Sequence, residues 1–270
     1  MSEIKNDYII SDLDKHDTFI DGKMFARGLI PRDYSANPMG CYATSDPWSV
    51  DVPTIPESEW DDRIRQQEID KSSLQHIRMR GDNGDPIKSL DQNGQGFCWA
   101  YSTAAAITIL RAAANMPHVR LSPHAVAMKI YGRDRGAWGA LSMDFAAANG
   151  FPSVTAWPEK SMSMNYDNDA TWADAAKYKV TEGWMDLNVQ AYDRNLAFGK
   201  IASALLANIP VVVDYNWWGY SVLAVRLLSN KRIVIWNSWT DSWGEMGMGI
   251  LEGSKAIPDG ACIARVVTGG

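Results

Sequence analysis

The residues with the clearest chemical potential in this chain are a cysteine and a nearby glutamine. Cys98 opens an alanine-rich, helix-prone run, and Gln92 lies six residues upstream of it. A cysteine at a helix N-terminus feels the positive end of the helix dipole, which lowers the pKa of the thiol. A turn at Gly94 and Gly96 brings the Gln92 amide back to donate a hydrogen bond to an oxyanion. The sequence therefore predicts a thiol nucleophile, with a small buried core cysteine as the equally weighted alternative.

The second half of the chain contains no imidazole that could act as the base for this thiol. The four histidines are His16, His76, His118 and His124, and all of them precede residue 125. A thiol nucleophile is usually activated by an adjacent base such as imidazole. The functional question is what a site with the nucleophile but without the usual base can do.

The composition is that of an acidic globular protein, and it excludes several functional classes. Of the 270 residues, 46% are hydrophobic and 21% are charged, and the formal net charge is −6. Because no basic run is present, we expect no nucleic-acid partner. No apolar stretch reaches the roughly 18 residues of a membrane span, and the first residues lack the pattern of a secretion signal. We therefore expect no membrane partner either.

The cysteine count bears on the compartment and on metal binding. Cys41, Cys98 and Cys262 are odd in number and widely spaced. Such a set argues against a disulfide framework and against a zinc site. We expect no metal and no other cofactor, and a location that is cytoplasmic or within an assembled particle.

The chain divides into three parts by its local patterns. Residues 1–85 hold many turn formers and one predicted helix, over 57–71, so they read as an extended arm that the body, a second copy or another partner must hold. Residues 86–195 are mainly helical, and residues 196–270 are mainly β-rich. The predicted helices cover 98–115, 122–131, 141–149 and 196–208. The predicted strands cover 210–213, 221–225, 232–236 and 248–251, and they favour a small antiparallel sheet or a partial barrel.

A second block of polar and aromatic residues follows the strand at 232–236. It contains Asn237-Ser238-Trp239, Trp243-Gly244-Glu245 and Gly247. Together with Gln92, Cys98-Trp99-Ala100 and the strand at 221–225, this block resembles the papain family of cysteine peptidases. The resemblance covers about residues 86–255. It implies an α+β, papain-like two-lobe fold, with Cys98 on a helical lobe and Tyr220 and Asn237 on an antiparallel β lobe.

The resemblance also implies roles for individual residues. Cys98 corresponds to the nucleophile and Gln92 to the side chain of the oxyanion hole. Asn237 corresponds to the residue that orients the base, and Trp239 to the indole that shields this contact from water; packing in the core is the alternative for Trp239.

A weaker correspondence concerns substrate binding. In the segment 134–138, Gly136 matches the glycine that binds a substrate backbone, and Trp138 then lies near a side-chain pocket. The ligand implied is a protein or peptide in the cleft between the lobes.

The chain departs from the family pattern at the position of the base. The histidine that opens the strand before the asparagine block is replaced by Tyr220. A tyrosine is neutral near pH 7 and cannot form a thiolate–imidazolium pair. Tyr220 either fills the cleft and hydrogen-bonds Asn237 in an inactive site, or acts as a poor substitute acid–base. His124 is expected at the surface or in a helix cap, facing away from the cleft.

Two further features bear on function. Trp217 and Trp218, beside Tyr220, are expected to roof the cleft. The arm lacks the long charged helical pattern of an inhibitory pro-segment, so zymogen regulation is not predicted.

Three hypotheses follow from these features. The first is a catalytically impaired papain-like protein that acts as a binding or structural module. The second is an active thiol peptidase or amidase with an unconventional base. The third is a structural component of a larger assembly such as a phage virion, with the arm contacting a protein partner or another copy.

Overall fold

The computed structural model describes residues 8–14, 19–20, 23–24, 26–38, 52, 54–81, 84–187 and 194–268. Cys41 and His16 lie outside the described residues. The described helices are α1 (Trp60–Asp70), α2 (Leu74–Arg80), α3 (Cys98–Ala113), α4 (Pro123–Tyr131), α5 (Gly139–Ala148), α6 (Asp169–Ala175) and α7 (Arg194–Leu206). The described strands are β1 (Ile9–Ile10), β2 (Phe19–Ile20), β3 (Lys23–Met24), β4 (Val180–Asp186), β5 (Val211–Tyr215), β6 (Tyr220–Leu228), β7 (Arg232–Trp236), β8 (Met248–Leu251) and β9 (Gly260–Val267). None of these helices is both long and apolar enough to cross a membrane.

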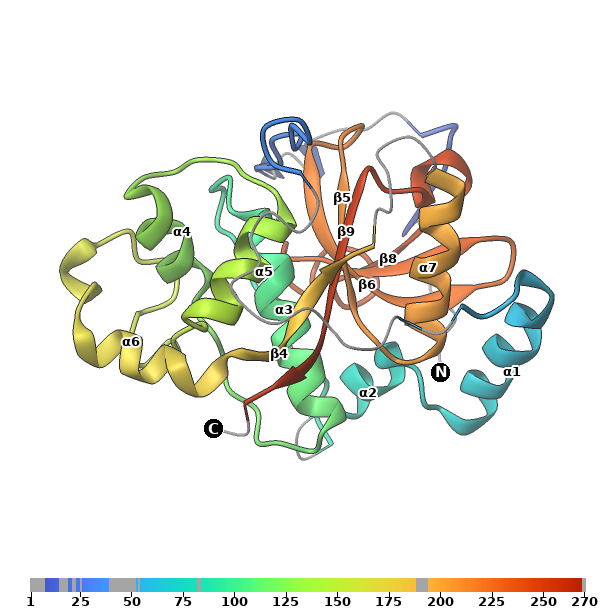
Figure 1. Cartoon of the computed structure of the whole chain (residues 1–270), viewed down its shortest axis with the longest axis horizontal. Coiled ribbons are helices and arrows are strands. Elements are labelled where there is room, and N and C mark those ends of the chain that lie inside the picture. Colours follow the sequence, from blue (N-terminus) through green and yellow to red (C-terminus); the bar gives the residue numbers. More distant parts are fainter. Residues whose placement is uncertain are drawn as a thin grey trace.

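A seven-stranded sheet organises the described part of the chain, in the order β1-β8-β7-β6-β5-β9-β4. The pairings from β8 to β4 are antiparallel, whereas β1 joins the edge in parallel, with Ile9 opposite Ile250. Figure 1 shows α3 and α5 on one side of the sheet and α7 and α1 on the other. The fold class predicted from the sequence, a mixed α+β architecture, is therefore confirmed.

Side chains from the two faces of the sheet form two hydrophobic clusters. On β5, Val212 belongs to the cluster shared with α3 and α5, while Val211 and Val213 belong to the cluster shared with α7 and α1. This alternation follows from the strand period of two. Since both faces are covered, the strands read as nearly continuous apolar runs.

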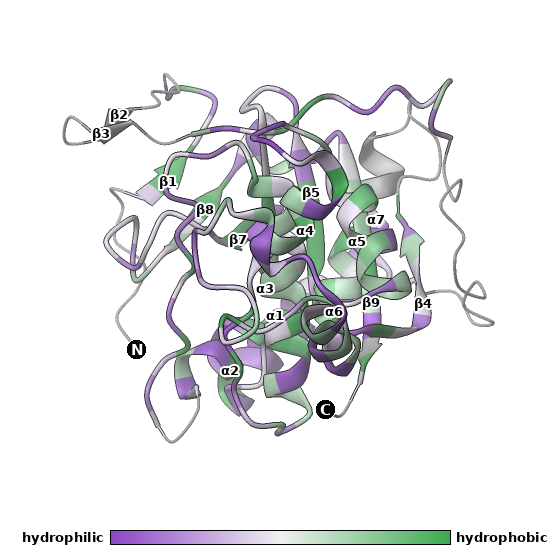
Figure 2. Ribbon diagram, turned by 90° about the vertical axis from the view of Figure 1, so that its left-hand side faces the viewer, coloured by the Kyte–Doolittle hydropathy of each residue, from purple (hydrophilic) through white to green (hydrophobic). Residues whose placement is uncertain are grey.

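The central helix is α3, which begins at Cys98 and contacts β5, β6 and β9. Its residues from Cys98 to Arg111 are all buried, and most of them are apolar, as expected for a helix in the core. Figure 2 shows α3 mainly green in the middle of the molecule, whereas α2 near the lower margin carries hydrophilic residues. The alanine-rich sequence lets neighbouring elements approach α3 closely on every side.

Most predicted elements are present in the structure, which also contains elements that the sequence patterns missed. It adds α2 after α1, so the described part of the first 85 residues contains two α-helices rather than one, and it adds α6 and the short strands β1, β2 and β3. It also adds β4 and β9 as neighbours in the sheet. Because β4 lies within residues 86–195, the part predicted as the helical lobe contributes a strand to the sheet.

The described parts of the N-terminal arm lie against the body of the same chain. β1 extends the sheet beside β8, and Asp12 accepts hydrogen bonds from the backbone and side chain of Ser254. Further on, the Ile55 backbone N–H donates to Oγ of Ser203 in α7 at 2.9 Å. Of the three ways to hold the arm, the described residues use the body.

Candidate active site

The candidate nucleophile lies at the junction of α3 and β6. Upstream of α3 the chain makes a tight turn, in which the Gln95 N–H donates to the Gln92 carbonyl at 3.1 Å and Gly94 has a φ of 80°. After this turn the chain enters α3, whose first residue is Cys98. Its Sγ accepts a hydrogen bond at 3.4 Å from the backbone N–H of Ser221, the second residue of β6.

The thiol of Cys98 is neutral at physiological pH. The side chain is 0% exposed, and burial raises the pKa of the thiol to about 12, with the nearby carboxylate of Asp214 acting in the same direction. Backbone N–H groups of Ser221, Gly28 and Trp99 lower this pKa, but by less. The expectation that the helix N-terminus would yield a lowered thiol pKa is therefore wrong, because the desolvation of a fully buried thiolate outweighs the favourable dipoles.

Tyr220 begins β6 and directs its hydroxyl into a buried polar cluster. The hydroxyl oxygen lies 2.7 Å from Asn237 Oδ1, 2.8 Å from Gln92 Oε1 and 2.8 Å from Ser238 Oγ. Ser238 Oγ also lies 2.8 Å from Gln92 Oε1. A phenol has a single proton, so one consistent arrangement has Tyr220 donating to Asn237 and Ser238 donating to Gln92. The structure thus brings Tyr220, Gln92 and Asn237 together in one hydrogen-bonded cluster.

Aromatic rings enclose this cluster. The ring centroid of Tyr220 lies 4.7 Å from that of Trp239 and 4.9 Å from that of Trp218, and Trp217 stacks on Trp218. Trp239 is 3% exposed and Tyr220 is 0% exposed. Burial raises the pKa of Tyr220 well above 10, with the nearby Cys98 adding to the shift. The phenol is therefore a neutral hydrogen-bonding group that water does not reach.

The amide of Gln92 is engaged differently from the way the sequence suggested. Its Nε2 donates to the carbonyls of Ala26 and Gln95, at 2.8 Å each. Both amide hydrogens are thereby used by backbone oxygens, and Oε1 faces Tyr220. The Gln92 amide, which was expected to donate to an oxyanion, therefore donates to a backbone carbonyl of the N-terminal arm.

Residues 26–38, which we call the arm segment, lie over Cys98 between α5 and β6. The Ala137 N–H donates to the Gly28 carbonyl at 2.9 Å, and the Ile30 N–H donates to the Ala137 carbonyl at 3.0 Å. Leu29, between them, forms a parallel bridge with Ala137 and donates its N–H to the Gly219 carbonyl at 3.0 Å. The arm segment therefore fills the groove between Ala137 and Gly219 as a short added strand.

Glycines allow this close approach. A Cβ on Gly28 would lie 1.9 Å from the carbonyl oxygen of Gly96, and a Cβ on Gly136 would lie 2.5 Å from that of Gly28. Gly136, predicted to bind a substrate backbone, thus contacts the backbone of the arm segment. Trp138 is partly buried and precedes α5, and its ring packs at the border of the two hydrophobic clusters.

The site contains a carboxyl group that the sequence analysis missed. Asp214 on β5 lies opposite Ser221 on β6 and accepts the Gly139 N–H at 3.0 Å, where α5 begins. Burial raises its pKa to about 6, although hydrogen bonds from Ser221 and Gly139 oppose the shift. The available signal was one acidic residue in the otherwise apolar run Val211-Val212-Val213-Asp214-Tyr215.

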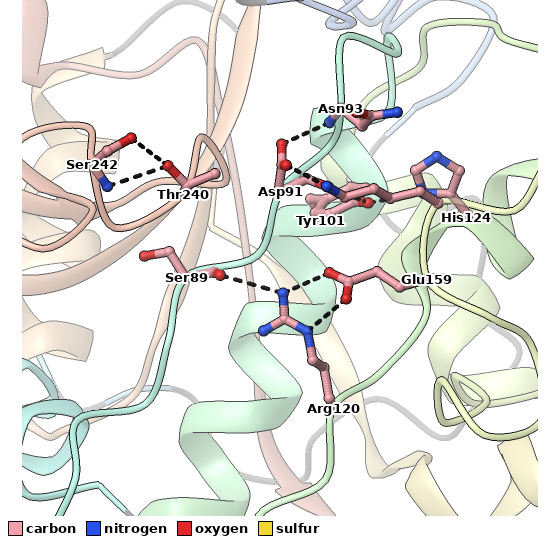
Figure 3. A network of polar contacts seen from close by, with 10 residues as sticks. Ser89, Asp91, Asn93, Tyr101, Arg120, His124, Glu159, Thr240 and Ser242 are labelled. Atoms are coloured by element: carbon pink, nitrogen blue, oxygen red, sulfur yellow. Dashed lines mark hydrogen bonds and ion pairs between the residues drawn. The ribbon is translucent and has the colours of Figure 1, made fainter.

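The described histidines lie elsewhere. His124 was expected at the surface or in a cap, but it is fully buried, with Nδ1 2.8 Å from the Tyr101 hydroxyl. Figure 3 shows this pair beside the ion pair of Arg120 and Glu159. Burial lowers the pKa of His124 to about 4. His118 lines a cavity near the C-terminal end of α3, at the opposite end from Cys98.

A metal site is not formed by the described residues. Within them, no three side chains of His, Cys, Asp or Glu are grouped so that they could hold a metal ion. Cys98 and Cys262 are both buried and free, and Cys262 lies on β9 in the cluster shared with α3.

Comparisons with known proteins were made for sequence and for structure. No protein-family model matches the chain, and no curated protein matches its sequence. Solved structures do match. Xylellain, a cysteine protease from Xylella fastidiosa, is similar with a TM-score of 0.54 and 20% identity, over 69% of this chain and 85% of that one.

Two further structures give the same result. The digestive procathepsin L 3 of Tenebrio molitor larval midgut has a TM-score of 0.53 at 20% identity, over 67% of this chain and 66% of that one. The bromelain protease from Ananas comosus, solved with the inhibitor E64, has a TM-score of 0.51 at 18% identity, over 67% of this chain and 94% of that one. These likenesses establish the fold, which is that of the papain-like cysteine proteases.

Proposed function

We propose that this protein uses the papain-like fold as a non-catalytic binding module, which holds an extended segment in its groove without cleaving it. The observation that carries the proposal is the hydrogen-bonded position of the Tyr220 hydroxyl, which lies 2.7 Å from Asn237 Oδ1 in a fully buried cluster. Asn237, which corresponds to the residue that orients an imidazole, instead accepts a hydrogen bond from the phenol of Tyr220.

The ionisation of the site supports this proposal. Peptide hydrolysis by a thiol needs a thiolate to attack and an acid to protonate the leaving amine. Because burial raises the pKa of Cys98 to about 12, the group is a thiol and not a thiolate at pH 7. Tyr220, whose pKa is also raised, neither accepts a proton from the thiol nor donates one readily to an amine.

The binding half of the proposal is supported by backbone groups of the groove. The N–H and carbonyl of Ala137 and the carbonyl of Gly219 hold the arm segment at 2.9 to 3.0 Å. Backbone groups arranged in this way bind an added strand with little regard to its side chains. A groove of this kind can bind a peptide without cleaving it.

Hydrolysis of a mixed peptide library, measured by mass spectrometry, tests the proposal. We expect no hydrolysis that depends on Cys98, so the wild type and Cys98→Ala should give the same product list. The Tyr220→His variant provides the matched comparison, because it restores an imidazole beside Asn237. Wild-type hydrolysis that Cys98→Ala abolishes would contradict the proposal.

One observation favours a second candidate, an active thiol hydrolase with an unconventional base. Asp214 has a pKa near 6 and a hydrogen bond from Ser221, whose N–H contacts Cys98 Sγ. In this candidate Asp214 would be the base, so Asp214→Asn would abolish any activity that depends on Cys98. The third hypothesis, a component of a larger assembly, stays a prediction that sedimentation of the purified chain tests.

A further inference from the structure

A buried ion pair fixes the arm segment beyond the point where it pairs as a strand. Arg32 Nη1 lies 2.9 Å from Asp186 Oδ1, and Nη2 lies 3.1 Å from Oδ2, so the contact is bidentate. The two side chains are 5% and 6% exposed. Buried pairs of this geometry are strong and specific, because a planar guanidinium matches both oxygens of a carboxylate.

The guanidinium of Arg32 makes further contacts through its other N–H groups and through its face. Nε of Arg32 donates to the Asn37 carbonyl at 2.9 Å, and Nη2 donates to the Pro38 carbonyl at 2.6 Å. Its Cζ lies 4.7 Å from the ring centroid of Tyr34, which is a favourable cation–π distance. The arm segment thus folds back on its own arginine and presents it to Asp186.

The acidic side of this contact belongs to the sheet. Asp186 ends β4 and lies opposite Cys262 on β9, and the same strand β9 pairs with β5, where Asp214 lies opposite Gly260. Arg32 is near enough to Asp214 to lower the pKa of that carboxyl. Asp186 is therefore a buried carboxyl group that pairs with a cation from the arm. Without that cation it would be a buried charge with a large desolvation cost.

The ion pair lies at a fixed sequence spacing from the residue that pairs in the groove. Leu29 pairs with Ala137, and Arg32 follows three residues later. The backbone pairing accepts any sequence that can approach as closely as Gly28 does, whereas the ion pair accepts only a guanidinium. The contact at Asp186 is consequently the part of the groove that discriminates between sequences.

We propose that Asp186, at the end of β4, forms a guanidinium pocket that selects the occupant of the groove. The occupant it selects is an extended segment with an arginine three residues after the residue that pairs with Ala137. The occupant is the arm segment of the same chain, which presents Arg32 to Asp186. This inference rests on the proposed function of the groove as a non-cleaving strand-binding site.

Access to Cys98 in the full-length chain provides the test, since Gly28 of the arm segment contacts the sulfur. The readout is the rate of alkylation of Cys98, followed by mass spectrometry of the Cys98 peptide. Loss of one partner of a buried ion pair costs a factor on the order of 100 in occupancy, so we expect Arg32→Ala to raise the rate roughly 100-fold. The matched control is Arg63→Ala, which removes an exposed pair with Glu59 and should leave the rate unchanged.

A peptide supplied in trans separates selection from a general loss of structure. A synthetic peptide of residues 26–38, added to the full-length Arg32→Ala variant, should slow the alkylation of Cys98 back towards the wild-type rate. The same peptide with alanine in place of Arg32 should be on the order of 100-fold less potent. Equal potency of the two peptides, protection by neither, or an unchanged rate in the variant would each overturn the inference.

The two proposals fail in distinguishable ways. Cleavage of the peptide, seen as fragments in the same spectra, would contradict the non-catalytic function and leave the selection by Asp186 measurable. Equal potency of the two peptides would contradict the selection of a guanidinium, but it would not affect the proposal that the protein does not hydrolyse peptides.

Discussion

At the scale of single residues, Tyr220 and Cys98 decide the chemistry of this groove. The hydroxyl of Tyr220 has three oxygens within 2.8 Å, those of Gln92, Asn237 and Ser238. Cys98 lies next to the backbone of Ser221 and is shielded from water. Burial keeps both the phenol and the thiol protonated, which supports the proposed non-catalytic function.

The Tyr220→Phe substitution tests how much this hydroxyl contributes. It leaves Oδ1 of Asn237 with one donor fewer in a buried cluster, which costs about 1–3 kcal/mol. We expect the free energy of unfolding, measured with denaturant, to fall by this amount. Tyr166→Phe, at a half-buried position, is the control and should change it by less than about 0.5 kcal/mol. Equal effects would show that the cluster does not depend on the phenol.

At the scale of elements, short contacts between segments far apart in sequence hold the groove closed. The arm segment lies between the backbone of Ala137 and that of Gly219, although more than a hundred residues separate it from either. On the other side, α1 and α2 are joined to β6 through Arg226, which lies 2.6 Å from Glu68 and 3.2 Å from Gln75. The helices and the arm are thus fixed to the sheet by specific polar contacts.

The Gly28→Ala substitution tests whether backbone contact holds the arm segment in the groove. Its new Cβ would lie 1.9 Å from the carbonyl oxygen of Gly96, a backbone atom that cannot rotate away. Overpacking of this kind costs about 1–3 kcal/mol, so alkylation of Cys98 should accelerate roughly tenfold or more. Gly199→Ala in α7 adds a Cβ with no atom within 4 Å, and it should leave the alkylation rate unchanged. The same rate in both variants would mean that the arm segment does not control access.

His124, which joins α3 to α4 through Tyr101, predicts a pH dependence of stability. Its pKa is about 4 in the folded chain and about 6.5 when unfolded, so the unfolded chain binds more protons between these values. The stabilising contribution is present above pH 6.5 and is lost as the pH falls to 4, to a total of about 3 kcal/mol. Because His76 titrates in the same window, the measurement is the difference in unfolding free energy between the wild type and His124→Phe across pH 4–7. A difference that does not vary with pH would contradict the assignment.

At the scale of the whole molecule, one sheet separates two hydrophobic clusters and carries a buried carboxyl between them. Val212 of β5 faces α3, and Val211 and Val213 face α7. Asp214 continues the same strand at the margin of the groove, near Arg32 of the arm. This buried carboxyl is stabilised by hydrogen bonds from Ser221 and from the Gly139 N–H at the start of α5.

The Asp214→Asn substitution should stabilise the molecule at neutral pH. The pKa of Asp214 is raised from 3.8 to about 6, so the folded chain binds more protons than the unfolded chain between these values. Stability is consequently lost as the pH rises from 3.8 to 6, by up to about 3 kcal/mol. Asparagine removes this loss, so the variant should unfold at higher denaturant concentration at pH 7 and show no advantage below pH 3.8. Denaturant titrations at pH 7 and below pH 3.8 measure the change in the free energy of unfolding. A variant less stable than the wild type at pH 7 would contradict the prediction.

The amino-acid sequence was enough to predict the α+β fold, most of the described helices and four central strands. This was possible because hydrophobic period, capping residues and alanine-rich runs are local properties of the chain. It also identified Cys98, Gln92, Tyr220 and Asn237 as the residues to inspect, because their order along the chain is a motif that sequence can carry. Only the tertiary structure decided that the thiol is buried and neutral.

The same holds for Asp214, for His124 and for the arm segment in the groove. The pKa of a group depends on the desolvation and the charges that distant segments impose on it, and no local pattern encodes these. The pairing of Leu29 with Ala137 and of Arg32 with Asp186 joins parts of the chain more than a hundred residues apart. Such contacts exist only when the sheet has assembled, which is why the groove's own occupant could not be read from the sequence.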